Sequence, residues 1–414
     1  MRRRVAIVGV GLVTSLGSTR EGSWSRMLEG GCGIRDVTLF DTEGYRSRLA
    51  AEVAMDEVDA SLTAVERRRW SRSDRMGVHA ASEAIADAGL LDSGLDPSRI
   101  GVFLGAGTAD LLRSEDFYRT CLEAGIERAR LSGVWNHFWS TSVDVIASRF
   151  GFEGPRSCVV AACSSSTIAI GQATDAIRRG TADAILAGGS DALARLTFSG
   201  FNALRLMDPA PCRPFDRSRA GMNIGEGAAI LVLEDLDRAR RRGASIYAEL
   251  AGYGLGCEAF HPTAPEPEGR PVAAVVAAAL EDARVPAAEV DHINAHGTAT
   301  PQNDTAEARG FHHVFGARSG RIPLTSIKSM IGHCLGAAGA IEAAALTLSI
   351  ARGVIPPTIH HIETDAGCVV DVVANEPREQ PLRCGISTSL AFGGNDSALV
   401  IRSVEADHLI STVR

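Results

Sequence analysis

One cysteine stands where its thiol could act as a nucleophile. Residues 158–180 read CVVAACSSSTIAIGQATDAIRRG, in which an apolar run leads into Cys163 and a helical pattern follows it. The sulfur of Cys163 is therefore predicted to lie at a helix N-terminus, where unpaired backbone amides favour a thiolate and could bind a developing oxyanion. Most buried cysteines are inert, and Cys158, in the middle of the apolar run, fits that description. This stretch alone does not decide whether Cys163 is inert or reactive.

Partners for such a nucleophile occur in the second half of the chain. Residues 294–309, NAHGTATPQNDTAEAR, place His296 at the end of an apolar strand, and residues 325–339, TSIKSMIGHCLGAAG, contain Lys328 and His333. Each histidine alone is more often a structural hydrogen-bonding residue. A cysteine and two histidines, each at a strand end beside glycine and threonine, indicate a nucleophile with two neutral imidazoles, which is an acyl-transfer arrangement.

Lys328 is the only lysine in the chain, since the other 41 of its 42 basic residues are arginine. A chain that uses arginine everywhere else is predicted to need a compact ammonium group at this one position, where a planar guanidinium does not fit. The alternatives are a salt bridge without a catalytic part, or a lysine retained by accident.

Strands and helices must alternate to bring these residues together. Continuous apolar runs separated by helical patterns predict α/β layering. The predicted strands are 4–11, 100–107, 157–162, 183–189 and 228–234, and the predicted helices are 75–90, 165–179, 271–284 and 338–352. From about residue 246 the order of elements repeats, with a further strand at 291–297. Residues 108–145 are predicted to form an inserted, partly exposed helical segment.

Composition and length restrict the class of protein. A chain of 414 residues with a net charge of -8 is too long for one compact core, and its charge argues against nucleic acid as the main partner. Nine cysteines without a CxxC pair or a Cys/His cluster indicate neither a disulfide framework nor a metal site. The start, MRRRVAIVGVG, is interpreted as a buried strand rather than a signal peptide. We expect no membrane span and a cytoplasmic protein.

Four motifs in order, AACSSS, NAHGTAT, IKSMIGHCLGAAG and AFGG, resemble those of the β-ketoacyl-acyl-carrier-protein synthases, most closely the elongating Cys-His-His type. The resemblance extends from residue 4 to residue 401. It implies a thiolase-type duplicated α/β fold in five layers, α-β-α-β-α, with halves at 1–245 and 246–414. It also implies an acyltransferase that condenses a malonyl group on acyl carrier protein with an acyl thioester held on Cys163, without a cofactor or metal.

The resemblance assigns roles to further residues. His296 and His333 would donate hydrogen bonds to the malonyl thioester oxygen, and Lys328, paired with Glu307, would hold the loop of His333. The remaining assignments are an oxyanion hole from the amides of Cys163 and Phe392, a gating loop with Phe392 and Gly393, pantetheine binding by Thr298 and Thr300, and carrier-protein docking by Arg68, Arg69 and Arg205.

The chain also departs from the family pattern. The usual Gly-Gly-Thr-Asn after the gating phenylalanine is Gly393-Gly394-Asn395-Asp396, and the usual Asn-Ser-Phe-Gly before it is Thr388-Ser389-Leu390-Ala391. These changes beside the gate favour a polyketide or polyene pathway over housekeeping fatty-acid synthesis. There are three alternative interpretations. The chain could be a thiolase with Cys384 as its second cysteine, a non-catalytic chain-length factor, or an active subunit that pairs with such a factor. The partner is a second copy of this chain or a chain-length-factor-like subunit.

Overall fold

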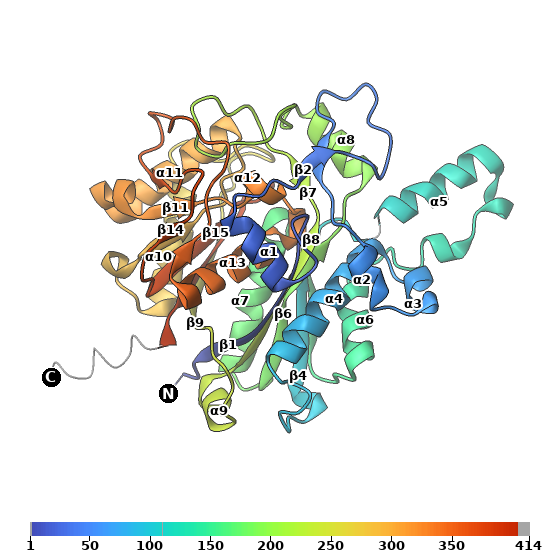
Figure 1. Cartoon of the computed structure of the whole chain (residues 1–414), viewed down its shortest axis with the longest axis horizontal. Coiled ribbons are helices and arrows are strands. Elements are labelled where there is room, and N and C mark those ends of the chain that lie inside the picture. Colours follow the sequence, from blue (N-terminus) through green and yellow to red (C-terminus); the bar gives the residue numbers. More distant parts are fainter. Residues whose placement is uncertain (1, 110, 405–414) are drawn as a thin grey trace.

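The computed structural model describes residues 2–109 and 111–404, and a large central sheet with helices on both sides dominates it (Figure 1). Five strands of the first half lie in the order β5-β4-β6-β8-β1. They are β1 (Val5–Val13), β4 (Ile100–Gly105), β5 (Arg156–Val159), β6 (Ala184–Asp191) and β8 (Gly227–Asp235). The predicted strand 157–162 ends at Val159, because the chain turns at Ala161 and at Ala162, whose φ is +48°.

The second half repeats this arrangement. Its strands lie in the order β11-β10-β15-β16-β9, so that both halves run from their third strand through the second, fourth and fifth to the first. The short strand β13 (Asp371–Val372) pairs with β11 at the outer edge. These strands are β9 (Ala248–Cys257), β10 (His292–Asn294), β11 (Pro323–Thr325), β15 (Cys384–Ser389) and β16 (Asn395–Arg402). The first strands meet through antiparallel pairing of β1 with β9. The repeat supports a duplication, and the boundaries 1–245 and 246–414 stay a prediction.

Helices complete the layers. On one outer side α4 (Arg72–Asp87) and α6 (Thr141–Phe150) cover the strands of the first half. On the other, α10 (Arg270–Ala283) and α11 (Pro301–Phe315) pack together against the second half. Between them, α7 (Ser165–Arg178) contacts α13 (Ala338–Arg352), and both touch strands of each half. Side chains of β1 alternate between two cores, with Ile7 in the central one and Ala6 in the outer one. The strand is therefore buried on both faces, as its apolar run predicted.

Two glycines permit the close packing that places the nucleophile. A Cβ atom on Gly105 of β4 would lie 2.1 Å from the backbone nitrogen of Ser166, and one on Gly339 of α13 would lie 1.9 Å from Oγ1 of Thr167. Any larger residue would push α7 away from its neighbours. The start of α7 is thus fixed from two sides.

The inserted segment stands apart from the body. Helix α5 (Leu111–Ala124) projects sideways beyond α3 (Ala64–Arg69) and α6, as Figure 1 shows. Apolar side chains on this segment are exposed, among them Tyr118, Leu122, Leu131, Trp135 and Phe138. The prediction of a partly exposed helical insertion at 108–145 agrees with this part of the structure.

One helical stretch has the length and composition of a membrane span. Among the residues described, Leu335–Arg352 is the single stretch long and apolar enough to cross a bilayer. It lies in the middle layer, and 89% of it is buried inside the protein. A helix covered on all sides needs no polar face, which explains its composition.

Candidate active site

Cys163 lies where the first half of the chain turns from strand to helix. It occupies a short 3-10 turn, Ala162–Ser164, between the end of β5 and the start of α7. The side chain is buried and lines a cavity of about 560 Å³. The sequence placed Cys163 at such a helix start correctly.

The charge state of Cys163 differs from the expectation. Burial raises the pKa of the thiol to about 11, whereas Lys328 and the backbone amides of Phe392 and of Cys163 itself lower it. The cost of placing a thiolate in this environment outweighs the amides at the helix start. Burial of Cys163 thus opposes the thiolate that the helix terminus favours. The same two amides face the sulfur, where an oxyanion formed at the attacked carbonyl would lie.

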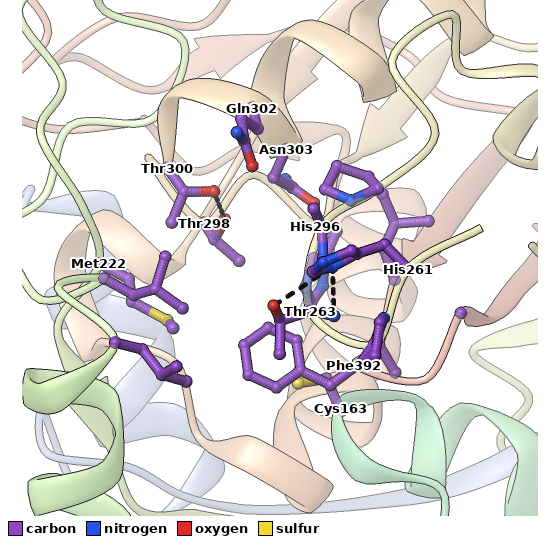
Figure 2. Close-up of a pocket in the computed structure, with 18 of the residues that line it drawn as sticks. Cys163, Met222, His261, Thr263, His296, Thr298, Thr300, Gln302, Asn303 and Phe392 are labelled. Carbon is purple, nitrogen blue, oxygen red and sulfur yellow. Dashed lines mark hydrogen bonds between the residues drawn. The ribbon is translucent and has the colours of Figure 1, made fainter.

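Both histidines reach the cysteine from the second half. His296 follows β10, and His333 follows the short helix α12 (Lys328–Ile331). The ligand atoms of Cys163, His296 and His333 all lie within 4.8 Å of one another, and the two imidazole rings meet edge to face with centroids 5.1 Å apart. Figure 2 shows Cys163 and His296 together in the pocket. The structure thus brings together the three residues that the sequence selected.

Both imidazoles are neutral. Burial lowers the pKa of His296 and His333 well below the ordinary value, and the charge of Lys328 adds to the effect in both. The ammonium of Lys328 lies 3.3 Å from Nδ1 of His296 and donates to it, which leaves the imidazole proton on Nε2. Neither ring nitrogen of His333 has a hydrogen-bond partner among the residues that the structure describes. Each ring can therefore donate one hydrogen bond into the pocket.

The predicted pair of Lys328 and Glu307 is wrong. Lys328 forms its ion pair with Glu342 of α13, and the side chains of both are buried. Glu342 is buried in α13, a helix whose other buried residues are uncharged. It is the single acidic residue in the predicted helix 338–352, and this lone carboxylate is the sequence signal that would have identified it.

Glu307 has a different task. Its carboxylate accepts hydrogen bonds from the backbone amides of His296 at 2.7 Å and Gly297 at 2.8 Å, and from the hydroxyl of Thr388 at 2.6 Å. Burial raises the pKa of Glu307 to about 7 despite these donors. Glu307 therefore fixes the turn that carries His296, whereas Lys328 contacts the imidazole itself.

The loop after β15 covers the cysteine. The amide of Phe392 faces the sulfur, and its ring lies 5.6 Å from that of Phe201. Gly393 has a φ of +83° and donates its amide to the carbonyl of Pro262 at 2.8 Å, so that this amide is not available to an oxyanion. Cys163 and Phe392 lie close together at one end of the drawn pocket (Figure 2). Whether this loop acts as a gate stays a prediction.

Thr298 and Thr300 line the same cavity. Their hydroxyl oxygens lie 3.0 Å apart, on the side of the pocket away from Cys163 and Phe392 in Figure 2. Two hydroxyls on the wall of a narrow cavity can hydrogen-bond the amide groups of an extended substrate arm. Their assignment to pantetheine stays a prediction.

The three predicted docking arginines are exposed but do not form one cluster. Arg68 and Arg69 end α3, whereas Arg205 follows α8 (Arg195–Ala203). Leu204 and Leu206, the neighbours of Arg205, line the cavity. Figure 1 shows α3 at the base of the α5 projection and α8 on another edge of the molecule. Arg205 thus lies at the pocket, and Arg68 and Arg69 lie on a separate face.

A metal ion could also be considered for the three central residues. Cys163, His296 and His333 are the one group of possible metal ligands of this kind within residues 2–109 and 111–404. The ammonium of Lys328 contacts His296 directly, and its positive charge opposes a cation at that position. The arrangement favours acid–base and nucleophilic chemistry instead.

A buried cysteine between two neutral histidines, in a duplicated α/β fold, defines a condensing enzyme of the thiolase type. Family models for the N-terminal and C-terminal domains of β-ketoacyl synthases match residues 2–239 and 247–361. The chain is 36% identical to 3-oxoacyl-[acyl-carrier-protein] synthase 2 of Staphylococcus aureus, with 98% of this chain and 99% of that protein covered. It therefore belongs to the β-ketoacyl synthase family.

Polyketide synthase subunits have about the same sequence identity to this chain. The tetracenomycin polyketide synthase ketoacyl synthase alpha subunit of Streptomyces glaucescens is 38% identical, with 96% of this chain and 97% of that protein covered. The solved structure of the ishigamide ketosynthase/chain length factor superposes with a TM-score of 0.93 at 36% identity, and covers 97% of this chain and 100% of the solved chain. The expected thiolase-type fold is confirmed by this likeness.

Proposed function

We propose that this protein is a β-ketoacyl-acyl-carrier-protein synthase that catalyses decarboxylative Claisen condensation. The observation that carries the proposal is a buried thiol with two neutral imidazoles, all within 4.8 Å, in one cavity. The proposal includes an acyl carrier protein as substrate donor, a cytoplasmic location, and no cofactor beyond the carrier-bound substrates.

The first step loads the acyl group. The sulfur of Cys163 attacks the thioester carbonyl, a carbon–sulfur bond forms, and the carrier thiol leaves with the proton of Cys163. Negative charge on the attacked oxygen would be stabilised by the amides of Cys163 and Phe392, which face the sulfur. Because burial raises the pKa of the thiol to about 11, we expect its proton to be lost as the sulfur attacks.

The second step forms the carbon–carbon bond. Malonyl thioester loses carbon dioxide, and the electron pair of the broken bond becomes an enolate on the thioester oxygen. His296 through Nε2 and His333 donate hydrogen bonds to that oxygen, and these bonds strengthen as its charge grows. The enolate carbon attacks the acyl group on Cys163, whose thiolate leaves and takes a proton from solvent. The ketone product stays on the carrier.

Two alternative activities fit the site less well. A thiolase would use Cys384 as second cysteine, but Cys384 is buried in β15, does not line the cavity, and has a pKa raised to about 12 by burial. A non-catalytic chain-length factor would not need the complete group of Cys163, His296 and His333. Release of carbon dioxide from malonyl-carrier protein separates condensation from thiolysis.

We further propose a dimer, either with a second copy or with a chain-length-factor-like subunit. Exposed apolar side chains of the α5 segment, including Leu122 and Trp135, provide a surface that a partner would cover. A relative named as an alpha subunit and a solved ketosynthase/chain length factor favour the mixed pair and a polyketide pathway. Co-expression of the chain alone and with such a subunit, followed by mass measurement of the native complex, tests this.

Carrier-protein docking is proposed at Arg68, Arg69 and Arg205. Reversing Arg68 and Arg69 to glutamate, or Arg205 alone, is expected to raise KM for the carrier protein with less effect on kcat. Reversal of Arg240 and Arg241, which are exposed on α9 (Leu236–Arg241) at another edge of the molecule, is the matched control (Figure 1). Equal kinetics in the docking variants and the wild-type protein would remove the assignment.

The function itself is tested with two carrier-bound substrates. The protein is incubated with acyl-carrier protein and malonyl-carrier protein, and carbon dioxide and the β-ketoacyl product are measured. We expect both in equal amounts from the wild-type protein, and no β-ketoacyl product from Cys163→Ala. Product formation without carbon dioxide release would contradict the proposal.

A further inference from the structure

Ser164, the residue after the nucleophile, does not use its hydroxyl to cap the helix that follows it. It stands at the N-cap position of α7, where a serine side chain ordinarily accepts a hydrogen bond from an amide of its own helix. The side chain of Ser164 makes no such bond and is fully buried. Its hydroxyl instead donates to two backbone carbonyls, that of Asn395 at 2.5 Å and that of Ser389 at 3.0 Å. The turn that carries the nucleophile is thus joined to a segment 225 to 231 residues further along the chain.

The two carbonyls mark the two ends of one loop. Ser389 ends β15 and Asn395 begins β16, and the antiparallel pairing of these strands makes residues 390–394 a hairpin loop. Because one hydroxyl bonds to both ends, Ser164 fastens the base of this loop to the start of α7. The Ser389 end has a second link to the same helix, since its hydroxyl oxygen lies 2.7 Å from that of Thr167. The loop therefore keeps one side-chain link to α7 when the Ser164 hydroxyl is removed.

The loop carries one of the two amides that face the nucleophile. The backbone amide of Phe392, in the middle of the loop, and that of Cys163 itself both hydrogen-bond the sulfur of Cys163, and the two residues lie close together in Figure 2. An oxyanion is stabilised best when both donors are held in place before it forms. Cys163 directly precedes Ser164, and Phe392 lies between the two carbonyls that Ser164 bonds. The hydroxyl of Ser164 therefore links the segments from which the two amides come.

We propose that Ser164 is a positioning residue that holds the backbone amide of Phe392 beside that of Cys163, so that the two amides act together on an oxyanion. This role rests on the proposed acyl transfer to Cys163, in which such an oxyanion forms. Ser164 does not line the cavity, so it acts through the position of the Phe392 amide and not on substrate. The tip of the loop has a separate tie, because the amide of Gly393 donates to the carbonyl of Pro262 at 2.8 Å. Loss of the Ser164 hydroxyl should therefore shift the loop without detaching it.

Two reactions of the same thiol separate this role from a purely structural one. Acyl transfer from an acyl-N-acetylcysteamine thioester passes through a tetrahedral oxyanion, whereas in alkylation by iodoacetamide the sulfur displaces iodide and no oxyanion forms. Both rate constants are measured on the Cys163 peptide by mass spectrometry, in the wild-type protein, in Ser164→Ala and in Ser166→Ala. The ratio of the acylation rate to the alkylation rate cancels changes in access to the thiol and in its reactivity. What the ratio retains is the stabilisation of the oxyanion.

We expect the ratio in Ser164→Ala to fall about tenfold or more below the wild-type ratio, since removal of a whole oxyanion donor costs on the order of 100-fold and here the donor is displaced. Ser166→Ala is the matched control. Ser166 is equally buried at the start of the same helix, but its hydroxyl accepts from the amide of Ala340 in α13 at 2.9 Å, so its loss should lower the melting temperature and leave the ratio unchanged.

A wild-type ratio in Ser164→Ala would show that the hydroxyl is only structural, and it would overturn the proposal while acyl transfer to Cys163 stands. Failure of the proposed function has a different signature. The wild-type protein would then be alkylated at Cys163 and never acylated, and the role of Ser164 would fall with the reaction.

Discussion

Replacing Lys328 with arginine keeps the positive charge and tests whether shape matters. The side chain of Lys328 is 2% exposed and fits between Glu342 and Nδ1 of His296, which is 3.3 Å from the ammonium. A guanidinium is larger and planar, and a group added to a closed site costs ~1–3 kcal/mol in displaced neighbours. The neighbour free to yield is the imidazole of His296, since Glu342 is fixed within α13.

The displacement should appear in condensation. If the full cost falls on the hydrogen bond from His296 to the enolate oxygen, condensation slows by about five- to 150-fold, at about 1.4 kcal/mol for each factor of ten. Acyl transfer to Cys163 uses the amides of Cys163 and Phe392 instead, so it should change by less than about threefold. Carbon dioxide release from malonyl-carrier protein measures the first, and the mass of the acylated protein measures the second.

A paired variant separates chemistry from stability. Lys328→Met alone leaves the buried Glu342 without a partner, at a cost of about 3–5 kcal/mol, and is expected to unfold readily. The double variant Lys328→Met with Glu342→Leu replaces the pair by apolar groups and should regain most of that stability. We expect it to accept an acyl group and still fail to condense. Normal condensation by Lys328→Arg or by the double variant would refute the reasoning.

Three further outcomes are expected from substitutions of buried residues. In Glu307→Gln, an amide replaces the acceptor of two backbone donors, so we expect ~1–3 kcal/mol lower stability in urea unfolding and slower condensation, with Glu281→Gln at an exposed position of α10 as a control. Because burial lowers the pKa of His292 from 6.5 to about 4, wild-type stability contributed by the neutral ring is present above pH 6.5 and is lost toward pH 4. The destabilisation caused by His292→Asn should therefore shrink by about 2 kcal/mol between pH 7.5 and pH 5, and a constant difference would contradict it. In Gly339→Ala, the added Cβ would meet Thr167, so we expect a lower melting temperature and slower acylation of Cys163, whereas Gly243→Ala at an open surface turn should leave acylation unchanged.

Local patterns predicted most of the architecture because β1, β4, β6 and β8 are buried along nearly their whole length. Runs such as VAIVGVG contain no alternating polar residues, so their continuous apolar sequence identifies them as buried strands without knowledge of the fold. Cys163 and His296 were found for a similar reason, since each closely follows an apolar strand, whereas His333 follows the short helix α12 and was found by its motif. Their convergence, however, depends on pairing two halves of the chain through β1 and β9, which no local pattern contains.

The partner of Lys328 could not be deduced in the same way. Glu307 lies one helical segment after His296, and its acidic side chain made it the obvious candidate by motif. Instead, the carboxylate of Glu307 accepts hydrogen bonds from the backbone amides of His296 and Gly297. Similarly, the burial of Cys163 arises only when the layers assemble. This burial raises the pKa of the thiol and opposes the local effect of the helix terminus.

The central claim is that Cys163 carries the acyl group that an enolate then attacks. Intact-mass analysis after incubation with acyl-carrier protein tests it directly, followed by addition of malonyl-carrier protein. We predict a mass increase equal to the acyl group, its absence in Cys163→Ala, and its disappearance from the wild-type protein when malonyl-carrier protein is added. Labelling that persists in Cys163→Ala, or an acyl group that malonyl-carrier protein does not remove, would contradict the claim.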